Sequence, residues 1–202
     1  VIDEAKPLAD MKSVLKFVRP YLSLADVASV NLETQLADKN PPHALPKSVT
    51  FYTSTAILDA LKWGGVDYVA LGNNHTFDYR GAGLLSTLDA LASSNLGHSG
   101  AGQNERAARK PYVTTHNEVP ISFSSYVGWA GDFQPNQVAT RDKGGAALAT
   151  SDSVREDILA VSEGESSVVQ IHTGLEYHDH PTMNQRTLFR EAIDAGADLV
   201  LG

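Results

Sequence analysis

The stretch VALGNNHTFDYRG, residues 69–81, ends an apolar run on two asparagines and a histidine. Residues 66–71 predict a buried strand, and residues 83–92 predict a helix with leucines at helical spacing. The polar residues 73–75 lie at the turn between them. Polar side chains at the end of a buried strand cost stability unless they bind something or hydrogen-bond the backbone. The stretch therefore predicts an α/β unit whose turn is either a ligand site or an Asx turn.

Strand and helix patterns alternate on both sides of this stretch. Helical spacing occurs at 11–22, 53–63, 83–92, 153–162 and 183–195, and strand patterns occur at 26–30, 66–71, 96–100, 167–171 and 198–201. Thr53 or Ser54 can cap the second helix, and Gly64 with Gly65 can end it. Pro20 is expected to break the first helix near its end. The alternation favours α/β layers.

Three segments depart from this alternation. Residues 112–127 alternate in the manner of a β-hairpin, with Asn117 and Glu118 at its turn. Residues 34–50 are rich in proline, asparagine and lysine and predict a loop. Residues 128–150 are glycine-rich and lack a pattern, so we expect a long surface loop of the kind that binds ligands. With no internal repeat, the sequence predicts a single domain over residues 1–202.

The composition excludes several classes of protein. The chain has 202 residues, of which 42% are hydrophobic and 20% charged, which suffices to bury a core. Its formal net charge of -8 repels phosphate backbones, so no nucleic-acid partner is expected. The absence of cysteine excludes disulfides, zinc–thiolate sites and thiol nucleophiles. Because no apolar run reaches about 18 residues, we expect membrane association only through segments outside this chain.

Polar residues follow three of the predicted strands at their carboxyl ends. These residues are Asn31 and Glu33, then Asn74 and His75, then His172 and Glu176. Ligand sites of α/β sheets gather at the carboxyl edge, so we expect the three groups to meet there. Their oxygen and nitrogen atoms suit manganese, iron, zinc or magnesium. Such a metal activates water, and a histidine beside it can protonate a leaving group.

Each of these residues also has a purely structural interpretation. Asn74 and His75 can cap the turn before the next helix, as Asx side chains commonly do. His172 can be a strand-end histidine that hydrogen-bonds the backbone, and Glu33 can be a solvated loop residue. The residue pattern alone leaves both interpretations open.

Five segments make the sequence resemble a known family. They are ADVASVNLETQL (25–36), VDYVALGNNHTFDYRGAGLLSTLDAL (66–91), GHSGAG (97–102), IHTGLEY (171–177) and AIDAGADLVLG (192–202). In this order they resemble bacterial capsule-synthesis proteins of the CapA type, in the poly-γ-glutamate biosynthesis group. That group is in turn similar to the calcineurin-like metallophosphoesterases. The segment at 66–91 is the most specific part of the match.

The resemblance implies a four-layer α/β/β/α sandwich with a two-metal centre between the strand ends. It implies that Glu33, Asn74 and His172 are ligands of divalent metal ions, with Asn31 beside Glu33. It further implies that His75 is the general acid. Glu176 would be a further ligand or a partner of His172. The implied function is that of a cell-envelope capsule or poly-γ-glutamate synthesis protein with a metal-dependent, phosphoesterase-like hydrolase site.

The sequence departs from the pattern of this family at both ends. A Gly-Asp motif is expected on the first strand, and none is found before Leu8. A Gly-His-x-x-His type motif is expected after the last strand, where the sequence stops at Gly202. Position 173 is threonine where an aromatic residue is expected. We therefore interpret the chain as an excised piece that binds metal weakly on its own.

Other functions fit the same residues. A non-catalytic envelope scaffold would keep the fold and bind an anionic polymer or a protein of the export machinery. A sugar-binding domain would use Trp129 and Phe133 of the loop at 128–150. The resemblance implies an envelope polymer or its precursor and capsule synthesis or export proteins as partners. It also implies a location in the cell envelope or outside the cell.

Overall fold

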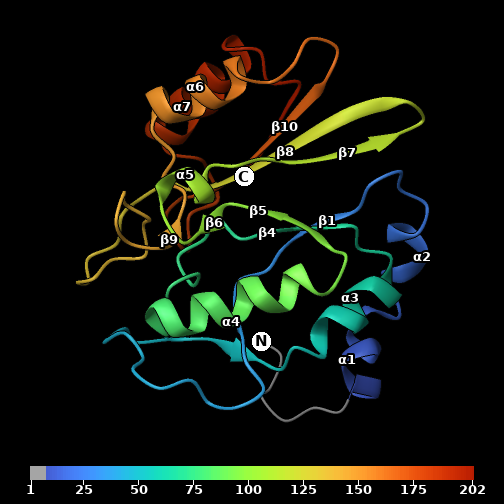
Figure 1. The fold of residues 1–202 in the computed structure, drawn as a ribbon. Helices are drawn as coiled ribbons and strands as arrows, with labels where there is room; N and C mark the ends of the chain where they lie inside the picture. The colour runs from blue at the N-terminus through green and yellow to red at the C-terminus, as the bar shows by residue number, and fades with distance from the viewer. Residues whose placement is uncertain (1–7) are drawn as a thin grey trace.

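The protein has helices on both outer faces of two sheets (Figure 1). The computed structural model describes residues 8–202. The first sheet is parallel and has the order β1-β4-β5. Its strands are β1 (Ser29–Asn31), β4 (Tyr68–Ala70) and β5 (Gly97–Ser99). The alternation of strands and helices therefore does yield a mixed α/β fold with parallel sheets.

The second sheet is mixed and has the order β11-β10-β8-β7. Its strands are β7 (Tyr112–His116), β8 (Val119–Val127), β10 (Ser166–His172) and β11 (Leu199–Leu201). Strand β10 runs parallel to both of its neighbours, while β7 and β8 form the predicted hairpin. Asn117 and Glu118 take positive φ angles of 48° and 68°, which a tight hairpin turn requires.

Seven helices and two small sheets complete the described part of the chain. The helices are α1 (Leu8–Leu15), α2 (Arg19–Leu22), α3 (Ile57–Gly64), α4 (Arg80–Ala92), α5 (Glu105–Ala108), α6 (Ser151–Leu159) and α7 (Met183–Asp194). The small sheets pair β2 (Gln35–Leu36) with β3 (Tyr52–Thr53), and β6 (Ala101–Gly102) with β9 (Gly145–Ala146). None of these helices combines the length and apolarity that a membrane crossing requires.

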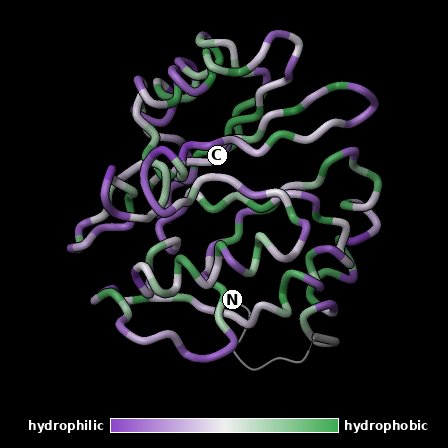
Figure 2. The backbone as a smooth tube through the Cα atoms, viewed as in Figure 1, coloured by the Kyte–Doolittle hydropathy of each residue, from purple (hydrophilic) through white to green (hydrophobic). Residues whose placement is uncertain are grey.

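Apolar residues recur along both sheets and the helices that cover them (Figure 2). One cluster includes Leu58, Val69 and Leu84, and joins the first sheet to α3 and α4. Another joins the second sheet to α6 and α7. Tyr68 and Phe123 stack between the two sheets with ring centroids 4.8 Å apart. Because the two sheets share this apolar interface, the carboxyl ends of β4 and β10 are held close together.

Gly72 fits where the first sheet approaches the backbone of β8. Its amide donates to Ser125 Oγ at 2.9 Å, and a Cβ added there would lie 2.6 Å from the carbonyl carbon of Ser125. We expect Gly72→Ala to lower the free energy of unfolding by about 1–3 kcal/mol, because backbone must move to admit the methyl group. Denaturant unfolding measures this. Gly81→Ala is the control, since nothing lies within 4 Å of its added Cβ. Equal stability of the two variants would contradict the close approach.

The prediction for the start of the second helix is wrong. Helix α3 has Ala56 as its N-cap and no side-chain cap, rather than Thr53 or Ser54. The hydroxyls of Ser54 and Thr55 donate instead to Asp38 Oδ1, each at 2.9 Å. The helix expected at 11–22 is interrupted before Pro20, since α1 ends at Leu15, and Pro20 itself lies in the first turn of α2.

The segment at 128–150 is more ordered than its composition predicts. It contributes β9, which pairs with β6, and its Val138, Ala146 and Ala147 are buried. The amide of Val127 donates to Ala147 O at 2.8 Å, so the segment returns to the second sheet. The sequence pattern missed this because the buried residues are small alanines, which give a weak periodic signal.

Candidate functional site

Three strand ends meet at one edge of the two sheets, as the sequence predicts. Asn31 and His172 are the last residues of β1 and β10, and Asn73 follows β4. The Asn31 amide Nδ2 lies 3.4 Å from His172 Nδ1. The Asn73 amide donates to Asn31 Oδ1 at 3.0 Å. Asn31 therefore links all three strand ends.

Four side chains place oxygen and nitrogen atoms around a common point. His172 Nε2 lies 2.9 Å from Asn74 Oδ1. Glu33 Oε1 lies 3.7 Å from Nε2 of both His75 and His172. Asn31 Nδ2 donates to the other oxygen of Glu33 at 3.1 Å, which fixes the direction of the carboxylate. We call Glu33, Asn74, His75 and His172 the strand-end cluster.

His75 is held by a carboxylate on its far side. Its Nδ1 lies 2.7 Å from Asp78 Oδ2, and Phe51 packs against the imidazole with ring centroids 4.4 Å apart. Since Nδ1 is the nitrogen that faces Asp78, Nε2 is the nitrogen that faces Glu33 and the cluster. An aspartate in this position fixes the tautomer and orientation of a histidine.

Asp78 is itself fully buried and fully partnered. Its oxygens lie 2.6 Å from Lys47 Nζ and accept from the Phe51 amide at 2.7 Å. Lys47 also donates to Asn74 O at 2.8 Å. The segment at 34–50 is therefore tied to the turn after β4 by a buried ion pair.

The two asparagines of the opening stretch have different roles. Asn73 is buried, and its Oδ1 accepts from the His75 amide at 3.0 Å, which is an Asx turn. Its Nδ2 donates to Leu32 O at 3.0 Å. Asn74 instead points across to His172. The structural interpretation thus holds for Asn73, while the side chain of Asn74 is directed into the cluster.

Burial lowers the pKa of His172, and repulsion from His75 lowers it further, against the attraction of Glu33. The neutral imidazole fits its neighbours: Nδ1 can accept from the Asn31 amide while Nε2–H donates to Asn74 Oδ1.

Trp129 covers the imidazole ring of His172, with ring centroids 5.8 Å apart and ring planes at 26°. The Gly128 amide donates to His172 O at 2.9 Å, so the first residue of the segment at 128–150 is anchored to the end of β10.

A cavity of about 310 Å³ lies beside the cluster, between the two sheets. Asn31, Gly72, Gln170 and His172 are among its lining residues. Gln170 Oε1 is buried and has no hydrogen-bond partner in the described residues. Since a buried polar atom costs free energy when it is unsatisfied, the cavity suits a polar occupant.

The donor atoms fit a divalent metal ion only in part. Glu33 Oε1, Asn74 Oδ1 and His172 Nε2 converge, and these are the ligand types that hard and borderline divalent ions take. Within residues 8–202, however, no group of three His, Asp or Glu side chains is arranged to hold a metal. A closed site needs about four ligands or more. The cluster can therefore supply part of a coordination sphere.

Glu176 does not join the cluster. It is exposed in the segment after β10, and it has no hydrogen bond or ion pair to the cluster residues in the part of the chain that the structure describes. Sequence reasoning also missed three contributors, Lys47, Asn73 and Asp78. Asp78 could have been predicted as a partner of His75, because it lies three residues after it in the stretch at 69–81.

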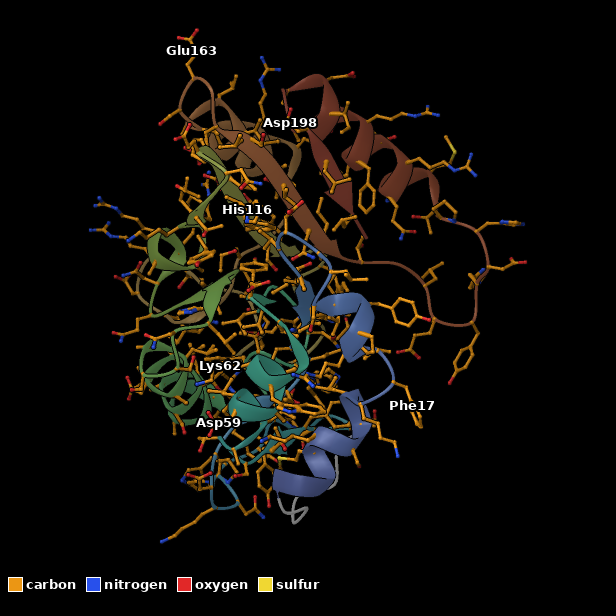
Figure 3. All side chains as sticks on the ribbon, turned by 90° about the vertical axis from the view of Figure 1, so that its right-hand side faces the viewer. Phe17, Asp59, Lys62, His116, Glu163 and Asp198 are labelled. Atoms are coloured by element: carbon orange, nitrogen blue, oxygen red, sulfur yellow. The ribbon has the colours of Figure 1, made fainter. Side chains whose placement is uncertain are left out.

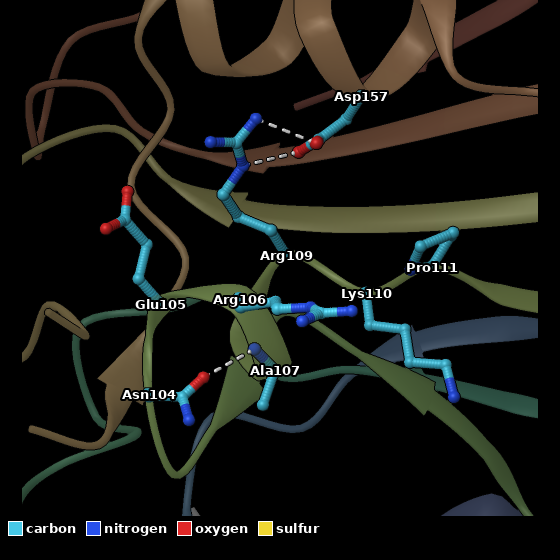
Figure 4. Close-up of a pocket in the computed structure, with 8 residues that line it drawn as sticks. All are labelled: Asn104, Glu105, Arg106, Ala107, Arg109, Lys110, Pro111 and Asp157. Atoms are coloured by element: carbon cyan, nitrogen blue, oxygen red, sulfur yellow. Dashed lines mark hydrogen bonds and ion pairs between the residues drawn. The ribbon is translucent and has the colours of Figure 1, made fainter. Parts of the chain in front are cut away.

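Another cavity, with a volume of about 750 Å³, lies beside α5 (Figure 4). Arg109 lines this cavity and donates two hydrogen bonds to Asp157, from Nε to Oδ2 at 2.9 Å and from Nη2 to Oδ1 at 2.8 Å. Tyr126 donates to the same carboxylate at 2.8 Å. Hydrogen bonding to Asp157 raises the pKa of Arg109. Because this arginine is already paired with Asp157, it joins the end of α5 to α6.

Comparisons with known proteins find relatives along most of this chain. The capsule biosynthesis protein CapA of Bacillus anthracis is 28% identical over 94% of this chain. The PGA biosynthesis protein CapA of Bacillus subtilis is 26% identical over 94%, and a probable polyglutamine synthesis accessory protein of Mycobacterium tuberculosis is 28% identical over 88%. The matches cover 47%, 50% and 49% of these relatives, so the chain spans about half their length.

The family match covers residues 1–202, which includes every residue of the strand-end cluster. The description of that family is bacterial capsule synthesis protein PGA_cap. The chain belongs to this family.

Proposed function

We propose that this chain carries part of a metal-dependent, phosphoesterase-like hydrolase site of a capsule or poly-γ-glutamate synthesis protein. The observation that supports it is the convergence of Glu33, Asn74, His75 and His172 at the strand ends. The names of the relatives support a role in capsule or poly-γ-glutamate synthesis, since they are capsule and PGA biosynthesis proteins. The proposed partners are an envelope polymer or its precursor and capsule synthesis or export proteins, in the cell envelope.

Glu33, Asn74 and His172 would hold a divalent ion such as manganese, iron, zinc or magnesium. Such an ion supplies an activated water and a positive charge against a phosphoryl oxygen. The chain would contribute orientation: Asn31 fixes the Glu33 carboxylate through its 3.1 Å hydrogen bond, and Trp129 covers one face of His172. An ion held by Nε2 of His172 would displace the proton that this nitrogen donates to Asn74, so the ring would then carry its proton on Nδ1.

His75 would act as the general acid. Asp78 holds Nδ1, so a proton on Nε2 faces the cluster and can pass to a leaving-group oxygen. The imidazole is almost fully buried, at 6% exposure, which keeps competing water away from the proton. To act as an acid the ring must carry a proton on each nitrogen, with Nδ1–H donated to Asp78 and the Nε2 proton free to leave.

Metal binding tests the first half of this proposal without activity. We expect the chain to take up Mn²⁺ weakly, and His172→Ala to reduce the affinity at least about tenfold. Equilibrium dialysis with metal analysis measures both. His116→Ala is the control, because His116 pairs with Asp26 at 2.8 Å on an exposed hairpin end. Unchanged uptake by the His172 variant would mean that the ion binds elsewhere. A longer form with the remaining ligands is expected to hold about two ions.

A non-catalytic envelope scaffold is the second candidate. It is favoured by one observation, that no three His, Asp or Glu side chains in residues 8–202 are arranged to hold a metal. A scaffold would bind its polymer or export partner equally well after treatment with a chelator. Loss of binding on metal removal would favour the hydrolase proposal instead.

A further inference from the structure

A further cavity, with a volume of about 440 Å³, is lined by α3 and by the loop that follows β1. Its apolar lining residues include Leu15, Val30, Leu32, Phe51, Ile57 and Leu61. In Figure 3, Asp59 and Lys62 mark the outer side of α3. Ile57 and Leu61 lie on its buried side. Small-molecule sites have volumes of roughly 300–1,000 Å³, so the cavity is large enough for a ligand. We call it the α3 cavity.

The α3 cavity reaches the strand-end cluster. Glu33 lines it, and Glu33 Oε1 is the atom that lies 3.7 Å from His75 Nε2. Phe51 also lines the cavity, and its ring packs on the imidazole of His75 with ring centroids 4.4 Å apart. A group that departs with the Nε2 proton of His75 starts beside Glu33 and Phe51, so it can extend into the α3 cavity.

The lining of the α3 cavity carries no positive charge. Of its lining residues, all within the described part of the chain, none is lysine, arginine or histidine, and Glu33 is the one carboxylate. An anionic group would meet that carboxylate without a counter-charge. Thr53 also lines the cavity, and its buried Oγ1 has no hydrogen-bond partner in the described residues. The cavity therefore suits an uncharged, mainly apolar group rather than a segment of an anionic polymer.

We propose that the α3 cavity binds the leaving group of the substrate, and that this group is an uncharged, apolar alcohol. The inference rests on the hydrolase site proposed above. The attacking water forms the new bond to phosphorus and gives up one proton to solvent. The bond from phosphorus to the ester oxygen breaks with its electron pair, and that oxygen takes the Nε2 proton of His75. The substrate class is therefore a phosphate ester of an apolar alcohol.

Methyl NMR tests binding of the alcohol without turnover. In a longer form of the protein, 1-octanol is expected to shift the methyl resonances of Ile57. It is expected to bind at least about tenfold more tightly than ethanol, because six more methylene groups leave water. Ile158 is the matched control, since it is buried in the apolar cluster of α6 and α7. No shift at Ile57, or equal binding of the two alcohols, would overturn the proposal.

A filled cavity tests the location of the ligand. Val30→Phe adds volume on β1 where it lines the α3 cavity, and it is expected to weaken 1-octanol binding at least about tenfold. Val113→Phe is the matched control, because Val113 is 49% exposed on β7. Thermal unfolding shows whether both variants fold. If Val30→Phe does not fold, the resonances of Ile57 in the wild type decide. A folded Val30→Phe that binds like the wild type would contradict the assignment.

Turnover separates this proposal from the hydrolase proposal. With Mn²⁺ present, kcat/KM for n-octyl phosphate is expected to exceed that for ethyl phosphate at least about tenfold. Equal hydrolysis of both esters, without a shift at Ile57, would overturn the cavity assignment and leave the hydrolase site standing. A shift at Ile57 with no hydrolysis of either ester would overturn the hydrolase site, and with it the role of the bound alcohol as a leaving group.

Discussion

Asp78→Ala is expected to lower the free energy of unfolding by about 3–5 kcal/mol, because it leaves a buried ammonium and a buried imidazole without their carboxylate. The side chain of Asp78 has no solvent exposure and that of Lys47 has 11%. Three contacts are lost together: Lys47 Nζ at 2.6 Å, His75 Nδ1 at 2.7 Å and the Phe51 amide at 2.7 Å.

Thermal and denaturant unfolding measure the effect. For a chain of this size, the expected loss corresponds to a fall in Tm of roughly 10 °C. Asp59→Ala is the matched control, because Asp59 also pairs with a lysine, Lys62 at 3.1 Å, but is 62% exposed. Exposed pairs of this kind contribute little, so a change within about 0.5 kcal/mol is expected.

A second variant separates the ion pair from the rest of the network. Lys47→Met added to Asp78→Ala removes the unpaired ammonium, so the double variant is expected to be less destabilised than the sum of the single variants. A loss in Asp78→Ala no larger than that in Asp59→Ala would show that the buried network does not stabilise the fold.

The positions of Asn31, Glu33, Asn74, His75 and His172 could be predicted because they depend on local pattern and on a general property of α/β sheets. Each follows an apolar strand, and the carboxyl ends of the strands meet at one edge. The partner of Asp78 could not be predicted in this way. Lys47 lies in a segment without periodicity, and its position is set by the tertiary fold rather than by its neighbours in sequence.

The first helical region shows a second limit of pattern reasoning. Met11, Leu15, Val18 and Leu22 have helical spacing, which predicts one buried face. The structure buries Met11 and half-buries Leu15 and Leu22, but leaves Val18 exposed. Because both sides of the segment are apolar, periodicity identifies the helices and cannot tell which side packs on α3.

His75→Gln is expected to lower kcat for a generic phosphodiester by about 10²–10⁴-fold with Mn²⁺ present, because general acid catalysis contributes that range. Glutamine keeps much of the shape of the buried side chain but cannot supply a proton from the position that faces Glu33. The measurement is made on a longer form that contains these residues, since the relatives are about twice as long as the region matched.

Substitutions of the two histidines are expected to change metal content and kcat differently, because the two residues have different proposed roles. His75→Gln is expected to keep its metal while kcat falls, because His75 acts on the leaving group. His172→Ala is expected to lose metal and activity together, because Nε2 of His172 lies among the converging donor atoms. His116→Gln, on the exposed end of the hairpin, should match the wild type in both measurements. Undiminished hydrolysis by His75→Gln would remove His75 from the chemistry. No hydrolysis by the wild type would leave the envelope scaffold as the better account of the same cluster.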